Sequence, residues 1–279
     1  MRGAMYFKQG SPLFLLLLIF AISGPSMADH SWGKYKWKPS SIPFDLILGD
    51  NVNSDWDGYL VGVSTQWSVS SVLDTTVNPG STDPMSCNPE SGNVQVCNAA
   101  YGNTGWLGLA QIYGRGTSIT AGIAKVNDTY FNTAYYNTLA WRGMVMCQEI
   151  AHTFGLDHQD ETFDNVNLGT CMDYTDDPDG SIDDELSNVY PNQHDYDQLV
   201  SIYADSKGGK GGKDDGGCNP KSPKCNPASA PGNSAHGHAQ WGRLVSGHGG
   251  VETYEKDLGN GVKLITHVIW TLEHANNHY

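Results

Sequence analysis

The chain has little positive charge. It contains 16 lysine and arginine residues against 30 aspartate and glutamate residues, which gives a formal net charge of −14 at pH 7. Because phosphate groups are repelled by such a surface, we expect neither nucleic acid nor an anionic membrane as a partner. After residue 28 the sequence also lacks any apolar run long enough to span a membrane, so we expect no membrane attachment once the N-terminal segment has been removed.

The cysteines lack the CxxC spacing of a cysteine zinc site. The six cysteines instead fall as neighbours along the chain: Cys87 with Cys97, Cys147 with Cys171, and Cys218 with Cys225. Because other pairings are possible for six cysteines, nearest-neighbour disulfides are a hypothesis. Such bonds persist outside the reducing cytosol, so the hypothesis requires export.

The N-terminal segment has the pattern of a secretory signal. Arg2 and Lys8 supply positive charge, an apolar run follows from Leu13 to Ile22, and Ser26-Met27-Ala28 offers small residues for cleavage. We therefore assign residues 1–28 as a signal peptide and expect a secreted protein, extracellular or, in a Gram-negative bacterium, periplasmic. An uncleaved anchor is the alternative.

The mature chain divides by composition into three parts. Residues 29–204 hold most of the apolar residues, and short strands are expected over 44–48, 106–112 and 119–126. Three helices are expected. The first begins with a capping box at Ser54 and Asp57. The second runs from near Asn137 or Thr138 to Phe154, where Gly155 stops it, and the third begins after Asn192.

The C-terminal part looks weakly tied to the rest. Residues 205–240 are rich in Gly, Lys, Asp, Pro and Ser, as a linker is. Residues 241–279 suggest a small β-meander with a thin core, which either docks on the main domain or serves in export or attachment. We expect residues 205–279 to be dispensable for chemistry, unless one of three histidines there (His236, His238 or His267) completes a metal site.

The stretch from residue 147 to residue 158 carries the chemistry. Gln148 and His152 are four residues apart, so on a helix they project from one face, with Glu149 beside them. Gly155 lets the chain turn and bring His158 back toward the same point. Three donors converging with one position open form a catalytic zinc site, and a carboxylate beside it acts as general base.

This QExxHxxGxxH pattern resembles the HExxHxxGxxH motif of the metzincins, a clan of zinc peptidases. Downstream, Cys171-Met172-Asp173-Tyr174 is similar to their Met-turn, which runs beneath the metal. Residues 192–199 resemble the closing helix of the clan's matrixins, and the resemblance to the clan covers roughly residues 40–204. Tyr174 matches the arrangement in astacins and serralysins, which implies that it ligates zinc in the resting enzyme and stabilises the transition state. The resemblance also implies a protein or peptide substrate.

The resemblance implies an α/β (α+β) fold: a twisted sheet, an active-site helix, a Met-turn and a closing helix, here with the C-terminal β-meander added. Its ligands would be Gln148, His152 and His158, with Gln148 weaker because an amide oxygen suits zinc less than imidazole does. Met172 and Gly155 would be structural. A bond between Cys147 and Cys171 would fasten the helix to the turn.

Two questions stay open in the sequence. Gln148 allows either a zinc endopeptidase with a weak ligand or an inactive metzincin-fold binding protein. The acidic residues 176–185 superficially resemble a calcium-binding EF-hand loop, but the first and twelfth positions, Thr175 and Leu186, do not supply its ligands. The sequence of this loop is compatible with calcium bound in another geometry and also with a loop that is simply solvated. The oligomeric state is not indicated.

Overall fold

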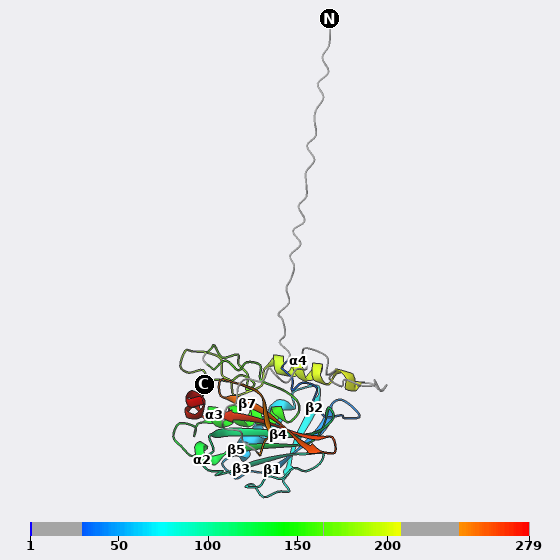
Figure 1. The fold of residues 1–279 in the computed structure, drawn as a ribbon. Helices are drawn as coiled ribbons and strands as arrows, with labels where there is room; N and C mark the ends of the chain where they lie inside the picture. The colour runs from blue at the N-terminus through cyan, green and yellow to red at the C-terminus, as the bar shows by residue number, and fades with distance from the viewer. Residues whose placement is uncertain (2–29, 164, 208–239, 279) are drawn as a thin grey trace.

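The structure is a computed structural model that describes residues 1, 30–163, 165–207 and 240–278 (Figure 1). The expected signal peptide lies outside the described residues, and so do Cys218, Cys225, His236 and His238. Among the helices that are described, none has the length and apolar character needed to cross a membrane.

The described residues form a mixed α/β fold with one eight-stranded mixed sheet and five α-helices, which confirms the fold class at that level. The strand order across the sheet is β2-β1-β3-β5-β4-β8-β7-β6. The strands are β1 (Phe44–Asn51), β2 (Leu73–Pro79), β3 (Val94–Ala99), β4 (Trp106–Arg115), β5 (Ser118–Asn127), β6 (Arg243–His248), β7 (Val251–Gly259) and β8 (Val262–Trp270). The helices are α1 (Asp57–Trp67), α2 (Asp128–Phe131), α3 (Leu139–His152), α4 (Gln193–Ile202) and α5 (Leu272–His278), with a 3-10 turn, η1 (Ala204–Lys207).

The part of the sheet formed by β1 to β5 contains all three expected strands and two that were not expected, β2 and β3. These two lie in a region, before about Gly105, that is rich in Asn, Gly, Pro and Ser, and both pair in parallel with β1. Strand β2 is a half-exposed edge, while β3 is a short buried run between polar turns. Neither has enough alternating apolar residues to be recognised from a single sequence.

The C-terminal strands continue this sheet. Strand β8 pairs antiparallel with β4 along its length, and β7 and β6 follow it outward. In Figure 1 the orange and red C-terminal strands lie beside the green strands β4 and β5. The meander therefore docks on the main domain, which was one of the two alternatives left open by its thin core.

The helix boundaries follow local capping chemistry in two of three cases. Thr138 Oγ1 accepts the Trp141 N–H at the start of α3, and Asn192 forms a capping box with Asp195 at the start of α4. The expected capping box at Ser54 is wrong. Helix α1 has Trp56 at its N-cap and no side-chain cap, because its apolar face, not its cap, fixes its position on the sheet.

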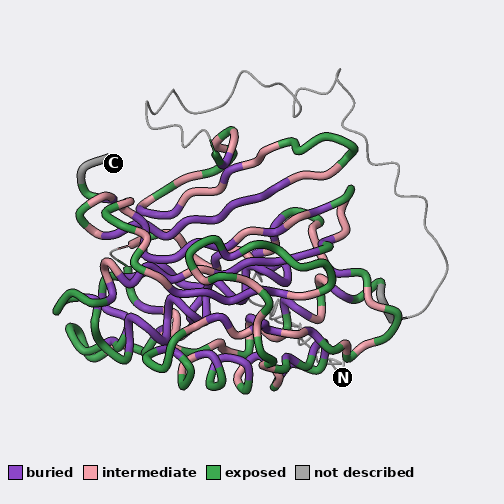
Figure 2. Tube along the Cα trace, turned by 90° about the horizontal axis from the view of Figure 1, so that it is seen from below, coloured by how far each residue is buried: buried purple, intermediate pink, exposed green. Residues whose placement is uncertain are grey.

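Helices α1 and α3 cover one face of the sheet, α1 over β1 and β2 and α3 over β4 and β5, and they pack against each other. The main core between these layers includes Val251, Ile265 and Ile269 from the C-terminal strands. Figure 2 shows the buried residues running through the sheet, with the outermost C-terminal strands largely exposed or intermediate. Residues from both parts of the chain thus share one core.

Candidate metal centre

The end of helix α3 is completely buried. Gln148, Glu149 and His152 each have 0% of their surface exposed. Gly155 ends the helical segment with φ of +102°, a conformation that favours glycine, and a side chain there would collide with the Tyr35 carbonyl. This turn brings the Leu156 carbonyl within 2.8 Å of His152 Nδ1. Because a carbonyl only accepts, Nδ1 carries the proton and Nε2 presents its lone pair.

Three histidines converge at this point. His152, His158 and His267 each offer a ring nitrogen, and these atoms all lie within 4.8 Å of one another. His152 and His267 are stacked with ring centroids 4.0 Å apart, and His158 meets both rings edge-on. The Nε2 atoms of all three have no hydrogen-bond partner among the described residues. Buried nitrogens without partners are costly, so the group fits a bound cation.

Strand β8 positions His267. In the antiparallel register it stands opposite Ala110 of β4, and paired residues project from the same face of a sheet. His267 shares that face with Ile265 and Ile269, which pack in the main core under α3. It is 1% exposed. Pairing of β8 with β4 therefore carries an imidazole from the C-terminal segment to the end of α3.

The charge state of the cluster suits metal binding. Burial holds the pKa of His152 well below its ordinary value, and it does the same for His267, with the neighbouring imidazoles adding to the effect. Both rings are therefore in the neutral form that ligates cations. The group itself contains only imidazoles among the described residues, and two carboxylates lie beside it: Asp157 Oδ1 is 4.0 Å from His267 Nε2, and Glu161 Oε1 is 3.5 Å from His158 Nδ1.

Glu149 lies next to the cluster but is not one of its members. Its carboxyl group packs against β4 so closely that a Cβ at Gly108 would overlap Oε1. Neither carboxyl oxygen has a hydrogen-bond partner among the described residues, and burial raises the pKa of Glu149 well above its ordinary value. A nearby cation would be the opposite charge that this buried group lacks. The position suits a general base and not a ligand.

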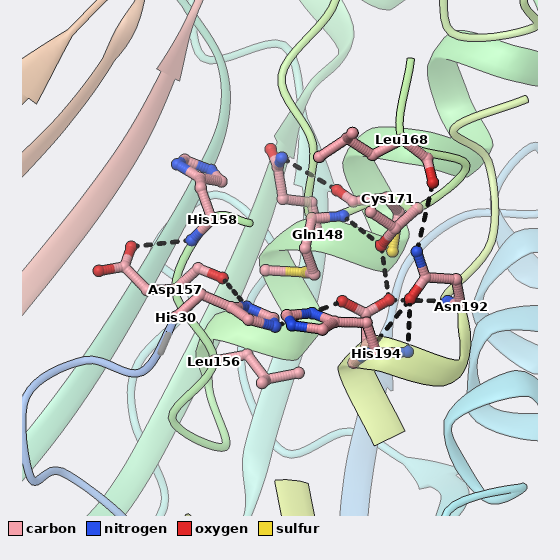
Figure 3. A network of polar contacts seen from close by, with 12 residues as sticks. His30, Gln148, Leu156, Asp157, His158, Leu168, Cys171, Asn192 and His194 are labelled. Atoms are coloured by element: carbon pink, nitrogen blue, oxygen red, sulfur yellow. Dashed lines mark hydrogen bonds and ion pairs between the residues drawn. The ribbon is translucent and has the colours of Figure 1, made fainter. Parts of the chain in front are cut away.

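Gln148 is turned toward the Met-turn segment. Its Nε2 donates to the Cys171 carbonyl at 3.0 Å, and Figure 3 shows the amide directed at that carbonyl. Its Oε1 has no partner among the described residues.

The Cys147–Cys171 disulfide links the same two segments as the Gln148 hydrogen bond. Both contacts fasten the helix to the turn. Cys87 is joined to Cys97, so two of the three hypothesised bonds are confirmed.

The other predicted site residues lie around this centre. Met172 is buried in the main core, and its carbonyl accepts the Gln159 N–H at 2.6 Å. Tyr174 is 1% exposed and packs on Phe163. Its hydroxyl lies against the turn between β6 and β7, where a Cβ at Gly250 would overlap it. The structure thus places Tyr174 beneath the C-terminal segment.

Two parts of the chain cover the cluster. The Trp32 indole stacks on His152 and His267, with ring centroids 5.2 and 5.3 Å away, and its Nε1 donates to Asp157 Oδ1. The β6–β7 turn rests on the loop after His158, since a Cβ at Gly249 would lie 2.7 Å from the Glu161 carbonyl oxygen. The cluster is therefore enclosed in this conformation.

Two carboxylates of the acidic loop, residues 176–185, accept hydrogen bonds from backbone N–H groups. Asp177 Oδ2 accepts the Ile182 N–H at 2.7 Å, and Glu185 Oε2 accepts the Asn167 N–H at 2.8 Å. The residues of 176–185 are not among the described groups that could hold a metal ion. Calcium binding by this loop stays a prediction.

His267 lies outside the QExxHxxGxxH motif. From the sequence it is only one of three histidines that would complete a metal site if the C-terminal part proved necessary. A signal was present in the sequence: His267 interrupts the apolar run from Leu264 to Trp270, and a buried imidazole in such a run needs a partner. Its partners could not be named without the β4–β8 register.

Comparisons with known proteins do not assign a family. No protein-family model matches the chain, and no curated protein matches it. The metzincin resemblance therefore rests on the residues of the motif and the Met-turn.

Proposed function

We propose that the protein is a secreted zinc-dependent endopeptidase, with zinc held by His152, His158 and His267. The convergence of three buried imidazoles, together with the Glu149 carboxyl group that has no hydrogen-bond partner among the described residues, carries this proposal. Three protein nitrogens with one position open are typical of catalytic zinc. The metzincin resemblance supplies the substrate class, peptide bonds, and the two disulfides fit an extracellular location.

Each residue has a defined task in this proposal. Bound zinc would polarise the scissile carbonyl and lower the pKa of a water molecule. Glu149 would accept the proton of the attacking water and return it to the leaving amine. The Leu156 carbonyl fixes the His152 tautomer, and the Cys147–Cys171 bond holds the helix on the turn. Tyr174 would support the developing oxyanion after the β6–β7 turn moves off its hydroxyl.

The proposal changes the role of Gln148. With His267 supplying the third nitrogen, the amide need not ligate zinc, and its bond to the Cys171 carbonyl makes it a positioning residue. The same reasoning reverses the expectation that residues 205–279 are dispensable. Removing β8 would take away a ligand and uncover Ile265 and Ile269 in the main core.

The enclosure of the cluster favours a second candidate, an inactive secreted binding protein in which zinc only stabilises the fold. Glu149 and His152 have no exposed surface, so a peptide reaches them only if Trp32 or the β6–β7 turn moves aside. The two candidates share the zinc site and differ in whether it opens. Retention of a buried Glu149 without a hydrogen-bond partner, which a purely structural site does not need, favours the peptidase.

The test is to measure zinc content and peptidase activity on the same sample of the full chain, with its disulfides intact. We expect the three histidines to bind one zinc and the protein to hydrolyse an unfolded protein substrate, and His267→Ala should lose that zinc and the hydrolysis. His248→Ala is the matched control, an exposed histidine of the same segment outside the cluster. Zinc bound without hydrolysis would establish the binding protein instead, and zinc unaffected by His267→Ala would remove His267 from the centre.

A further inference from the structure

A second group of side chains that can ligate a metal lies where the chain ahead of β1, beginning at residue 30, meets α4. This stretch is called the N-terminal segment below. His30, His194 and Asp195 each present one donor atom, and these atoms lie within 4.8 Å of one another. His30 is 3% exposed and Asp195 is 0% exposed. Figure 3 shows the two imidazoles side by side, with ring centroids 4.9 Å apart and planes within 15°. This group is separate from the three-histidine cluster.

The orientation of His30 is that of a ligand. Its Nδ1 lies 2.8 Å from the Asp157 carbonyl oxygen, which can only accept, so Nδ1 carries the proton. The Nε2 lone pair then faces Asp195 Oδ1 at 3.8 Å. Histidines that bind metals characteristically donate their other ring N–H to a backbone carbonyl. His152 is held in the same way by the neighbouring Leu156 carbonyl.

Asp195 presents a half-satisfied carboxylate. Its Oδ2 accepts bonds from Thr170 Oγ1 and the Asn192 N–H, at 2.5 and 2.7 Å. Its Oδ1 accepts no hydrogen bond from the described residues. His194 Nδ1 also has no hydrogen-bond partner among them. A buried carboxylate oxygen without a donor is costly, and a positive charge beside Oδ1 would remove that cost.

The spacing suits a cation better than a direct bond. At 3.8 Å, His30 Nε2 and Asp195 Oδ1 are too far apart for a hydrogen bond. Two donors on one tetrahedral zinc stand about 3.4 Å apart, as metal–ligand distances of about 2.0–2.1 Å require. The observed separation is within a few tenths of an ångström of that value. An ion pair between protonated His30 and Asp195 is the competing explanation.

We propose that His30, His194 and Asp195 form a second site for a late first-row divalent cation of the Zn²⁺ class. Two imidazole nitrogens and one carboxylate oxygen are a donor set that such cations accept. The site would fasten the N-terminal segment, whose Trp32 covers the three-histidine cluster, to helix α4. Its role is structural, and it is independent of the proposed peptidase activity.

The experiment counts metal on the full chain with disulfides intact. The protein is stripped with a chelator, reloaded with Zn²⁺ or Co²⁺, separated from free ion, and analysed for metal per chain. We expect two ions in the wild type, one in His194→Gln, one in His267→Ala and none in the double variant. Gln193→Ala, an exposed neighbour on α4, is the matched control and keeps two. The Co²⁺ visible spectrum should lose one component in His194→Gln.

The outcomes separate this proposal from the proposed function. Suppose that the wild type binds one ion, and that this ion is lost in His267→Ala but kept in His194→Gln. That result would overturn the second site, and the contact of His30 with Asp195 would then be an ion pair. An ion lost in His194→Gln but kept in His267→Ala would uphold the second site and overturn the three-histidine centre. If His194→Gln does not fold, His30→Gln removes a ligand from a different segment and decides the same question.

Discussion

The three-histidine cluster and the group of His30, His194 and Asp195 are built on the same plan. Each joins a helix end to a distant part of the chain: β8 brings His267 to α3, and the N-terminal segment brings His30 to α4. In each, one imidazole is oriented by a carbonyl of the loop after α3. That loop, residues 156–158, is the link between them.

The groups differ in charge and in their neighbours. The three-histidine cluster has only imidazole donors, with the Asp157 and Glu161 carboxylates beside them, and in the proposed function Glu149 would act as the base. The second group has a carboxylate among its donors, and one oxygen of that carboxylate is already held by two hydrogen-bond donors. The comparison teaches that the place of the carboxylate, beside the ligands or among them, separates a site proposed for catalysis from one proposed to fasten two segments.

The largest effect is expected for Glu149→Gln, which removes the base and keeps the shape. Hydrolysis should fall by about 10²–10⁴-fold, because a positioned general base contributes on that scale. Metal content should stay at the wild-type value, since Glu149 is not a ligand. kcat/KM on a peptide substrate and elemental analysis of the same sample check both. Unchanged hydrolysis would show that Glu149 is not the base, and the two groups would then no longer differ in having one.

Next in size is the replacement of Cys147 and Cys171 together by serine. Loss of this disulfide should lower the free energy of unfolding by about 2–4 kcal/mol. It should also weaken metal binding at both groups, because Thr170, next to Cys171, holds Asp195. The matched control is the double serine variant of Cys87 and Cys97, far from both groups. Denaturant unfolding and zinc titration measure the two effects, and equal zinc affinities in the two variants would contradict the prediction.

Gly250→Ala should destabilise the contact between the β6–β7 turn and Tyr174. The added Cβ would overlap the Tyr174 hydroxyl, and φ at this position is +121°, so the cost should be about 1–3 kcal/mol. Tyr174→Phe in the same chain should recover part of it. Gly259→Ala controls for backbone strain, since φ there is +83° and no atom lies within 4 Å of the new Cβ. Thermal unfolding of the wild type and the three variants decides; no recovery in the double variant would mean that the turn does not rest on Tyr174.

The smallest effect is expected for Gln148→His. An imidazole at this position should tighten zinc binding, because nitrogen suits this metal better than an amide oxygen does. The gain should be less than about tenfold, or about 1.4 kcal/mol, since His267 already supplies a third nitrogen. Competition with a zinc chelator measures the affinity, and the second group should not change. Unchanged or weaker binding would show that residue 148 does not face the metal.

The sequence by itself determined the local features of this protein. Thr138 caps the start of helix α3 and Gly155 turns the chain beyond its last residue, His152, because capping and left-handed backbone conformations depend on neighbouring residues. The spacing of Glu149, His152 and His158 fixed which side chains meet at the end of that helix. The pairing of Cys147 with Cys171 also followed from the order of the cysteines along the chain.

Only the tertiary structure decided how distant segments complete these groups. His267 reaches the cluster through the register of β8 on β4, and His30 reaches Asp195 through the docking of the N-terminal segment on α4. Sequence spacing sets geometry within a helix or turn, but a strand pairing across more than a hundred residues depends on the whole core. The main core, which includes Ile265 and Ile269, therefore determines which histidine joins His152 and His158.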